Sequence, residues 1–493
     1  MEFQTGAMTF RTARNYLDGE WVSGPLVASI SPATGSELGR FANGGAAEAD
    51  RAVFAARRAF DRTTWAHDRH LRAQVLTELA DRLAARRDEV INALAVENGK
   101  VLAEATIEVD MTVPKLRFYA ALALSDLGAA GEIRPDLYSM TLRQPAGVAA
   151  IIVPWNSPLV LSVRSLAPAL AAGCTVAMKM PGQTGLFNGI LYEIFASAPS
   201  LPPGVVNAFT ETGNLGAPAL VADPRVNVVS YTGSTEVGRV IMAQAAHNLT
   251  RMSLELGGKT PMVVFDDADL DVAVPVLTKG ITVLGGQFCM AGSRILAQRS
   301  IAGELRSRLA DSVAAVRIGP GDDPRSDMGP LIDVANAERV DRLVEKALSY
   351  ATPIVRGGIP DEPEFAGGAY YRPALLEVDS PDNDLVRREL FGPVATFETF
   401  DDEADAIRLA NATDYGLAAS VWSRDADRPL RVARRIDAGT VWLNTWAIVA
   451  DQFEEGGFKH SGIGRLNGKQ ALEEFQETKH VVHPVVPVSL TSH

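Results

Sequence analysis

Residues 147–158 of the 493-residue chain read GVAAIIVPWNSP. The six residues from Val148 to Val153 are all apolar, which is typical of a strand buried on both faces of a sheet. A helix is expected to follow from Pro158, with Ser157 as its cap. Alternating strands and helices predict a parallel, doubly wound α/β sheet. The further short apolar stretches that alternate with helical ones are 175–179, 205–209 and 226–231.

The same alternation returns after Pro261. The strands expected there are 262–265, 294–297, 394–400, 418–422 and 440–443. Single cores stop growing near ~250–300 residues, so a chain of this length is expected to form two or three lobes. The predicted fold class is α/β with two doubly wound lobes. Upstream, apolar residues at helical spacing predict helices at 45–60 and 70–87.

A small antiparallel sheet is expected beside the two lobes. From Tyr138 to Arg143 apolar and polar residues alternate, which predicts a half-buried antiparallel strand. The tail from 479 to 490 is rich in valine and contains Pro484 and Pro487, and prolines confine a strand to a sheet edge. Because an apolar edge strand can pair with another chain, this tail is a candidate subunit contact.

The composition argues against several classes of protein. The net charge of −13 gives no electrostatic footprint for nucleic acid or for an anionic membrane surface. No apolar run approaches the ~18 residues of a membrane span, and the N-terminus does not resemble a secretion signal. The two cysteines, Cys174 and Cys289, cannot form a disulfide framework, so a reducing, cytoplasmic location is expected. No metal site is expected.

Two polar residues stand where ligands bind in open α/β sheets. Asn156 follows the C-terminal end of the buried strand, and its amide can donate to a developing oxyanion. Cys289 lies in the glycine-flanked segment GGQFCMAGSR (285–294), where a backbone N–H can approach a substrate. Taken alone, each is better explained structurally: Asn156 as a turn residue before a helix and Cys289 as a small buried thiol. Cys174, in an apolar junction, is interpreted as a structural thiol.

Two further motifs could serve the same site. Glu255 in LELGGKTP (254–261) lies among apolar residues, which disfavour its ionised form and poise it as a base. In YTGSTEVG (231–238), Gly233 permits a tight turn and Ser234 or Thr235 can cap a helix whose N–H groups face an anion. The alternatives are a glutamate paired to a basic residue and an ordinary capped turn.

Taken together, the motifs resemble the NAD(P)-dependent aldehyde dehydrogenase superfamily, in its order and over almost the whole chain. LDGEW (17–21), SPATG (31–35) and ENGK (97–100) also fit. The main blocks are PWN (154–156), Lys179, GSTEVG (233–238), LELGGK (254–259), GQFCMA (286–291), ELFGPV (389–394), YGLAASVW (415–422) and GGFKHSGIGR (456–465).

The resemblance implies a catalytic set. Cys289 would attack the aldehyde to give a thiohemiacetal, and Asn156 would hold its oxyanion. After hydride loss to the cofactor, Glu255 would activate the water that hydrolyses the resulting thioester. The CoA-acylating members look different at the position of Glu255, so its presence argues for release of a free carboxylic acid.

The resemblance also implies a cofactor site. Trp155 and Lys179 match positions that line the adenosine half, and Gly233 and Ser234 match the pyrophosphate turn. Glu389 matches the carboxylate that holds the nicotinamide ribose, and Phe391 a residue against the nicotinamide. Gly182 replaces the glutamate that usually accepts hydrogen bonds from the adenosine ribose. NAD is therefore expected, with NADP as a second possibility.

The substrate residues are less defined by the resemblance. Arg164 matches a position that is arginine in semialdehyde and some aromatic aldehyde dehydrogenases, and it could pair with a substrate carboxylate. The alternative is an internal ion pair with Glu454 or Glu455. Phe288 and Met290 suggest a lipophilic lining, and Ser157 leaves room in the tunnel. The expected substrate is an aromatic aldehyde or a semialdehyde.

Similar proteins have three parts. The resemblance assigns 1–125 and 146–257 to a dinucleotide-binding domain, 258–470 to a catalytic domain, and 126–145 and 471–493 to oligomerisation segments. A homodimer or homotetramer is expected. Two other functions stay open: a cysteine-dependent esterase or thioesterase, and a catalytically silent binding protein. No histidine lies in a motif of the kind such a hydrolase would need.

Overall fold

A computed structural model describes residues 10–125 and 127–485. Its first sheet has eight strands in the order β2-β1-β9-β8-β7-β10-β11-β21, parallel from β9 to β11 and antiparallel at the edges. The strands are β1 (Asn15–Leu17), β2 (Glu20–Val22), β7 (Val148–Ile152), β8 (Thr175–Pro181), β9 (Val206–Glu211), β10 (Val228–Thr232), β11 (Arg251–Glu255) and β21 (Gly462–Ile463).

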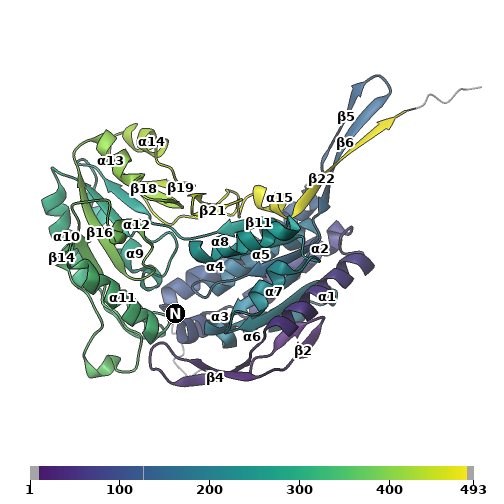
Figure 1. Cartoon of the computed structure of the whole chain (residues 1–493), viewed down its shortest axis with the longest axis horizontal. Coiled ribbons are helices and arrows are strands. Elements are labelled where there is room, and N and C mark those ends of the chain that lie inside the picture. Colours follow the sequence, from purple (N-terminus) through teal and green to yellow (C-terminus); the bar gives the residue numbers. More distant parts are fainter. Residues whose placement is uncertain (1–9, 126, 486–493) are drawn as a thin grey trace, which may run out of the picture.

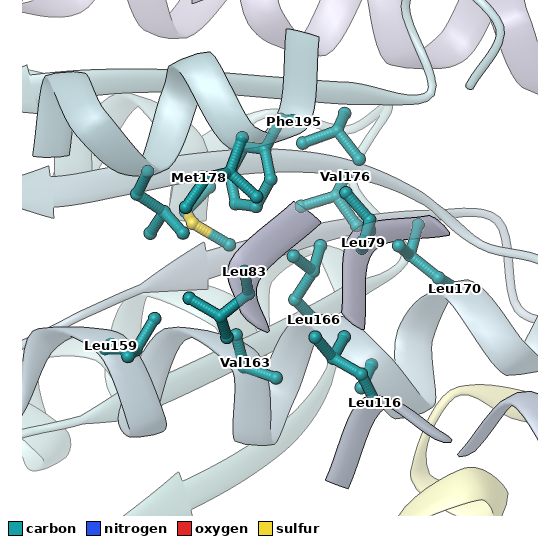
Figure 2. Packing of buried hydrophobic residues seen from close by; sticks show 14 of the residues in the cluster. Leu79, Leu83, Leu116, Leu159, Val163, Leu166, Leu170, Val176, Met178 and Phe195 are labelled. Carbon is teal, nitrogen blue, oxygen red and sulfur yellow. The ribbon is translucent and has the colours of Figure 1, made fainter. Parts of the chain in front are cut away.

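Helices cover both faces of this sheet (Figure 1). One face carries α1 (Ala46–Arg62), α7 (Gly216–Ala222) and α8 (Thr235–Ala245). The other carries α2 (Arg69–Ala85), α4 (Leu102–Ser125), α5 (Pro158–Ala172) and α6 (Gly185–Ala196). Every residue of β7 is buried, because alternate side chains enter the two cores. Figure 2 shows the core on the face covered by α2, α4, α5 and α6, where leucines of α2, α4 and α5 pack against Val176 and Met178 of β8.

The second sheet has seven strands in the order β14-β15-β16-β13-β12-β18-β19. It is parallel apart from the edge strand β14, and the helices that pack on it include α9 to α11, α13 and α14. Its elements are β12 (Pro261–Val264), α9 (Leu270–Thr282), β13 (Arg294–Gln298), α10 (Ala302–Ala314), α11 (Val334–Ala347), β14 (Thr352–Val355), β15 (Ala374–Glu377), β16 (Val394–Phe400), α13 (Glu403–Ala410), β18 (Ala418–Trp422), α14 (Arg428–Ala433) and β19 (Thr440–Leu443). The two sheets confirm the predicted pair of doubly wound lobes.

A third sheet, β22-β6-β5, projects away from both lobes (Figure 1). It consists of β5 (Ala129–Arg134), β6 (Leu137–Pro145) and the edge strand β22 (Gln476–Pro484), all antiparallel. The edge position predicted for the tail is confirmed as far as residue 484, and Pro487 lies outside the described residues. The prediction that the apolar face of β6 is buried is wrong for a single chain. Tyr138 and Leu142 on that face are 40% and 39% exposed, because no layer covers them.

Shorter elements complete the chain. Two-stranded pairs form between β3 (Leu26–Ile30) and β4 (Glu37–Ala42) and between β17 (Tyr415–Gly416) and β20 (Phe458–Lys459). Between α2 and α4 lie α3 (Arg87–Ala93) and a turn of π-helix, η1 (Leu94–Asn98); α12 (Asp384–Arg387) and α15 (Gln470–Glu474) come later. Within the described ranges, no helix has the length and apolar character needed to cross a membrane.

Candidate active site

Asn156 stands just past the C-terminal end of β7, and its side chain joins the two lobes. It is 5% exposed, and its Nδ2 donates to the backbone carbonyl of Gln287 at 3.0 Å. Gln287 is itself held in place, because its Nε2 donates to Leu284 and its Oε1 accepts from the amide of Ile332. The amide that was expected to stabilise an oxyanion is therefore anchored two residues before Cys289.

The ENGK segment fixes the loop that carries Asn156. Asn98 Nδ2 donates to the carbonyl of Trp155 at 2.7 Å, and Lys100 Nζ donates to Ser157 Oγ at 3.0 Å while pairing with Glu108. From sequence, ENGK was expected only as part of the family resemblance. The signal that could have found its role is the presence of three polar residues, Glu97, Asn98 and Lys100, in a stretch that is otherwise mostly apolar.

Ser157 precedes α5, as predicted, but its hydroxyl does not cap the helix. Glu108 Oε1 accepts from the amides of Leu159 and Val160 at 3.0 and 3.1 Å instead, and Ser157 Oγ faces Lys100. A carboxylate at a helix N-terminus satisfies free N–H groups and interacts favourably with the helix dipole. Ser157 thus belongs to a buried network behind the loop.

Cys289 lies between the short 3₁₀ turn η4 (Val283–Gly286) and β13. A Cβ on Gly258 would lie within 3.0 Å of the carbonyl oxygen of Cys289, and one on Gly286 would meet the backbone of Gly392. Gly286 also has a φ of +69°, a conformation that glycine adopts without strain. These glycines let three backbone segments approach one another around the sulfur.

The surroundings of Cys289 favour the protonated thiol. Burial raises its pKa to about 12, and the guanidinium of Arg164 opposes that effect only in part. Because the thiolate is the nucleophile, a base or the approaching substrate must take part in its activation.

Glu255 is the last residue of β11 and is 3% exposed. Its Oε1 has no hydrogen-bond partner among the described residues. Burial raises its pKa to about 8, while Arg164 lowers it and Glu455 raises it further. A carboxyl group with this pKa can accept a proton from water near neutral pH and release it again.

A cavity of roughly 850 Å³ brings most of the predicted residues together. Its wall includes both lobes and the N-terminus of α8. The predicted site residues that line it are Trp155, Asn156, Gly233, Ser234, Glu255, Cys289, Glu389 and Phe391. Lys179 is not among the lining residues. It lies on β8 opposite Ile152 of β7, and burial lowers its pKa although Glu211 opposes that effect.

The turn between β10 and α8 presents a helix N-terminus to this cavity. Ser234 is the N-cap, as predicted, and its Oγ accepts from the amide of Val237 at 3.3 Å. Gly233 is required for a different reason than predicted: its φ is not positive, but a Cβ there would lie within 3.0 Å of the Tyr231 hydroxyl. The free N–H groups of α8 favour an anionic group in the cavity.

Glu389 and Phe391 come from the segment before β16. Glu389 Oε1 accepts from the amide of Gly258 at 3.2 Å, and burial raises its pKa to about 7. A Cβ on Gly257 would collide with this carboxylate. Phe391 has a left-handed φ of +52°, and its ring packs edge-on against Trp155 with centroids 5.5 Å apart.

The expected substrate residues divide into different environments. Phe288 packs edge-on against Trp446 at 6.0 Å and is partly exposed. Met290 is 2% exposed in the core of the second sheet, so its side chain is packed against apolar residues there. Only its carbonyl has a polar role, accepting from Trp446 Nε1.

Arg164 is buried, with its guanidinium between two partners. Its Nη1 lies 3.4 Å from Glu455 Oε2 and its Nη2 donates to Thr232 Oγ1 at 3.2 Å. The internal ion pair considered for Arg164 is thus present, with Glu455. Glu454 is exposed and accepts from the amide of Gln470 at 3.3 Å.

Comparisons with known proteins agree with this geometry. The family model "Aldehyde dehydrogenase family" matches residues 21–481. The chain is 36% identical to betaine aldehyde dehydrogenase of Bacillus subtilis, over 96% of this chain and 98% of that one. It is 35% identical to 2-hydroxymuconic semialdehyde dehydrogenase of Pseudomonas sp. strain CF600, over 95% and 98%. A crystal structure of betaine aldehyde dehydrogenase from Staphylococcus aureus in complex with NAD+ superposes with a TM-score of 0.94 at 35% identity, over 97% and 96%. The chain therefore belongs to the aldehyde dehydrogenase family and is an oxidoreductase.

Gly258→Ala is expected to lower kcat/KM for aldehyde oxidation by ~10² without unfolding the protein, because the new methyl group displaces the backbone of Cys289 and small misplacements of a reacting group cost about that much. Gly303→Ala on α10, where nothing lies within 4 Å, is the matched control. Steady-state kinetics and circular dichroism measure both effects. Equal activity of the two variants would show that the close approach at Gly258 is not needed.

Proposed function

We propose that this enzyme oxidises an aldehyde to the free carboxylic acid with NAD+, through a thioester on Cys289. The observation that carries the proposal is the shared cavity in which Cys289, Asn156 and Glu255 lie beside the N-terminus of α8. The names of the relatives, which are dehydrogenases of betaine aldehyde and of semialdehydes, support the same reaction.

The cavity has the donors and acceptors that a nicotinamide dinucleotide needs. The N–H groups at the start of α8, with Ser234, suit a pyrophosphate. Glu389 offers carboxylate oxygens to ribose hydroxyls, and the rings of Trp155 and Phe391 offer flat apolar surface. When bound, NAD+ supplies the hydride acceptor.

The residues of this chain divide the reaction between them. The thiol of Cys289 gives its proton to water as the sulfur adds to the aldehyde carbon, and the oxyanion accepts hydrogen bonds from Asn156 Nδ2 and from the amide of Cys289. Asn156 would exchange its present bond to the Gln287 carbonyl for this one. Oxidation of the adduct leaves a thioester. Glu255 then takes a proton from water, the hydroxide attacks the thioester carbon, and the acid departs as the sulfur regains its electron pair.

Glu255→Gln is expected to allow one round of oxidation and then stall, with kcat lowered by about 10²–10⁴ because the thioester lacks its base. In the parent, the deprotonated form of Glu255 is the active one, so kcat should rise as the pH increases through about 8. The variant should lose this rising limb of the pH profile. Stopped-flow absorbance of NADH and mass spectrometry of the Cys289 peptide measure the two effects.

Cys289→Ser is the companion variant and should show no burst. Undiminished turnover by the serine variant, or ester hydrolysis by a parent that reduces NAD+ with none of the aldehydes, would refute the proposed reaction. The second outcome would favour a cysteine-dependent hydrolase.

We infer that NAD+ is preferred and that NADP+ is tolerated. Gly182, where similar proteins carry a glutamate, has no side chain to accept from the ribose or to repel a 2′-phosphate. A Cβ at this position would also collide with Thr212, so the glycine is fixed by packing.

The ratio of kcat/KM for NAD+ to that for NADP+ tests this inference. This ratio should be above one but small, because no carboxylate at position 182 repels the 2′-phosphate of NADP+. Equal efficiencies would contradict the preference for NAD+, and no detectable NADPH would contradict the tolerance.

For the substrate, we propose an aldehyde that bears a carboxylate or an aromatic ring. Arg164 Nε is buried and has no partner among residues 10–125 and 127–485, so one donor remains for an anion. The Phe288–Trp446 pair offers aromatic surface near Cys289. A cationic substrate is disfavoured by the same guanidinium, which already acts electrostatically on Cys289.

Butanal and 4-oxobutanoate, which differ by a carboxylate, test the part played by Arg164. The parent is expected to favour 4-oxobutanoate, and Arg164→Leu to lower that preference by at least ~10-fold, about the value of one charge-assisted hydrogen bond. An unchanged ratio of kcat/KM would remove Arg164 from the substrate site.

We further propose a homodimer or homotetramer in the cytoplasm. The projecting sheet exposes Ile133, Tyr138, Leu142 and Val482, and its edge strand β22 leaves backbone groups unpaired. We also propose that 126–145 and 471–493 serve oligomerisation, 1–125 and 146–257 cofactor binding, and 258–470 catalysis. The three sheets of the described residues support this division, apart from β21, which joins the first sheet.

A further inference from the structure

A chain of buried polar side chains leads from the loop after β19 to the end of β11. Lys115 on α4 pairs with Asp451 at 2.5 Å and donates to Asn467 Oδ1 at 2.6 Å. Asn467 Nδ2 donates to Glu455 Oε2 at 2.7 Å, and Glu455 in turn faces Arg164.

The direction of each hydrogen bond in this chain is determined. A lysine ammonium can only donate, so Asn467 must present its oxygen to Lys115 and its NH₂ to Glu455. Asn467 is fully buried and has a left-handed φ of +56°, which fixes the amide between its two neighbours. Glu455 Oε2 must therefore accept, from Asn467 on one side and from Arg164 Nη1 on the other.

The charges along this chain cancel in pairs. Lys115 is balanced by Asp451 and Arg164 by Glu455. The chain leads to the buried carboxyl group of Glu255. Glu255 is the register partner of Thr232, whose hydroxyl accepts from Arg164 Nη2, so the guanidinium lies beside Glu255 and acts on it electrostatically while its Nη1 contacts Glu455.

We propose that Glu455 is a positioning residue for thioester hydrolysis: by occupying the guanidinium of Arg164, it keeps Glu255 free of a salt bridge and available to water. The proposal rests on the function proposed above. In the absence of Glu455, Arg164 would have Glu255 as its nearest carboxylate, and a base held in such a pair is ionised at lower pH but is a weaker proton acceptor.

The ionisable groups around Glu255 come from several elements, and only one of them is altered in the test. Arg164 and Arg465 favour its ionised form, whereas Glu455 and Glu474 oppose it. Cys289 faces it across the cavity. Arg465 is engaged by the carbonyl of Gly464, and its own amide donates to Glu474, so these two groups stay in place when Glu455 is changed.

The experiment measures thioester hydrolysis as a function of pH, with NAD+ and either butanal or 4-oxobutanoate as the probe. In Glu455→Gln, the burst of NADH should persist. The rising limb of the kcat profile, near pH 8 in the parent, should shift to lower pH by about one unit or more, and the plateau value of kcat should fall about tenfold or more. Glu454→Gln removes the adjacent, exposed carboxylate and should behave like the parent. Glu455→Asp keeps the charge and should return the limb toward the parent.

A second variant keeps the test decisive if Glu455→Gln does not fold. Arg164→Met with Glu455→Met removes both charges and leaves neither unpaired. Its rise of kcat should occur at or above the pH of the parent's, because the guanidinium of Arg164, the larger of the two that favour the ionised form of Glu255, is gone. The proposal is overturned if kcat of Glu455→Gln rises at the same pH as kcat of Glu454→Gln. It is also overturned if the rising limb of the double variant shifts to lower pH. Absence of NADH formation by the parent with both aldehydes would instead defeat the proposed function.

Discussion

Burial of one uncompensated carboxyl group, Glu255, is the constraint around which the site is built. A carboxylate withdrawn from water without a counter-ion is costly, and the result here is a raised pKa. The guanidinium of Arg164 offsets that cost only in part. Gly257 and Gly258 follow at once, and a Cβ on the first would collide with the carboxylate of Glu389 and one on the second with the backbone of Cys289. The proposed base is therefore followed by two positions that glycine fits.

The same segment connects the two lobes. β11 ends at Glu255 and β12 begins at Pro261, so the chain passes from the first sheet to the second directly beside the base. Cys289 approaches this crossing from the second lobe and Asn156 from the first. The proposed base thus lies on the connection and the Cys289 backbone packs against it, while Asn156 is held through the carbonyl of Gln287, so packing supplies the precision that catalysis needs.

Much of this arrangement could be predicted from sequence, because buried parallel strands are apolar runs and the site residues follow their ends. The helix α4 was missed for a physical reason: buried positions such as Glu104, Glu108 and Lys115 are charged, so the apolar spacing of a helix is interrupted. The ion pair of Arg164 was named from sequence only as an alternative, with Glu454 or Glu455, because a partner 291 residues away is chosen by the fold and not by a local pattern. Met290 was misjudged because neighbours along a loop can face opposite sides.

The two cysteines show why pKa alone does not identify a nucleophile. Burial raises the pKa of both, to about 11 for Cys174 and about 12 for Cys289. Cys174 is fully buried, and its sulfur is satisfied by donating to the carbonyl of Phe475 at 3.2 Å. Cys289 is half-buried and lines the cavity that also contains Glu255 and Asn156. Access and neighbours, which depend on where the strands bring the loops together, distinguish the reactive thiol from the structural one.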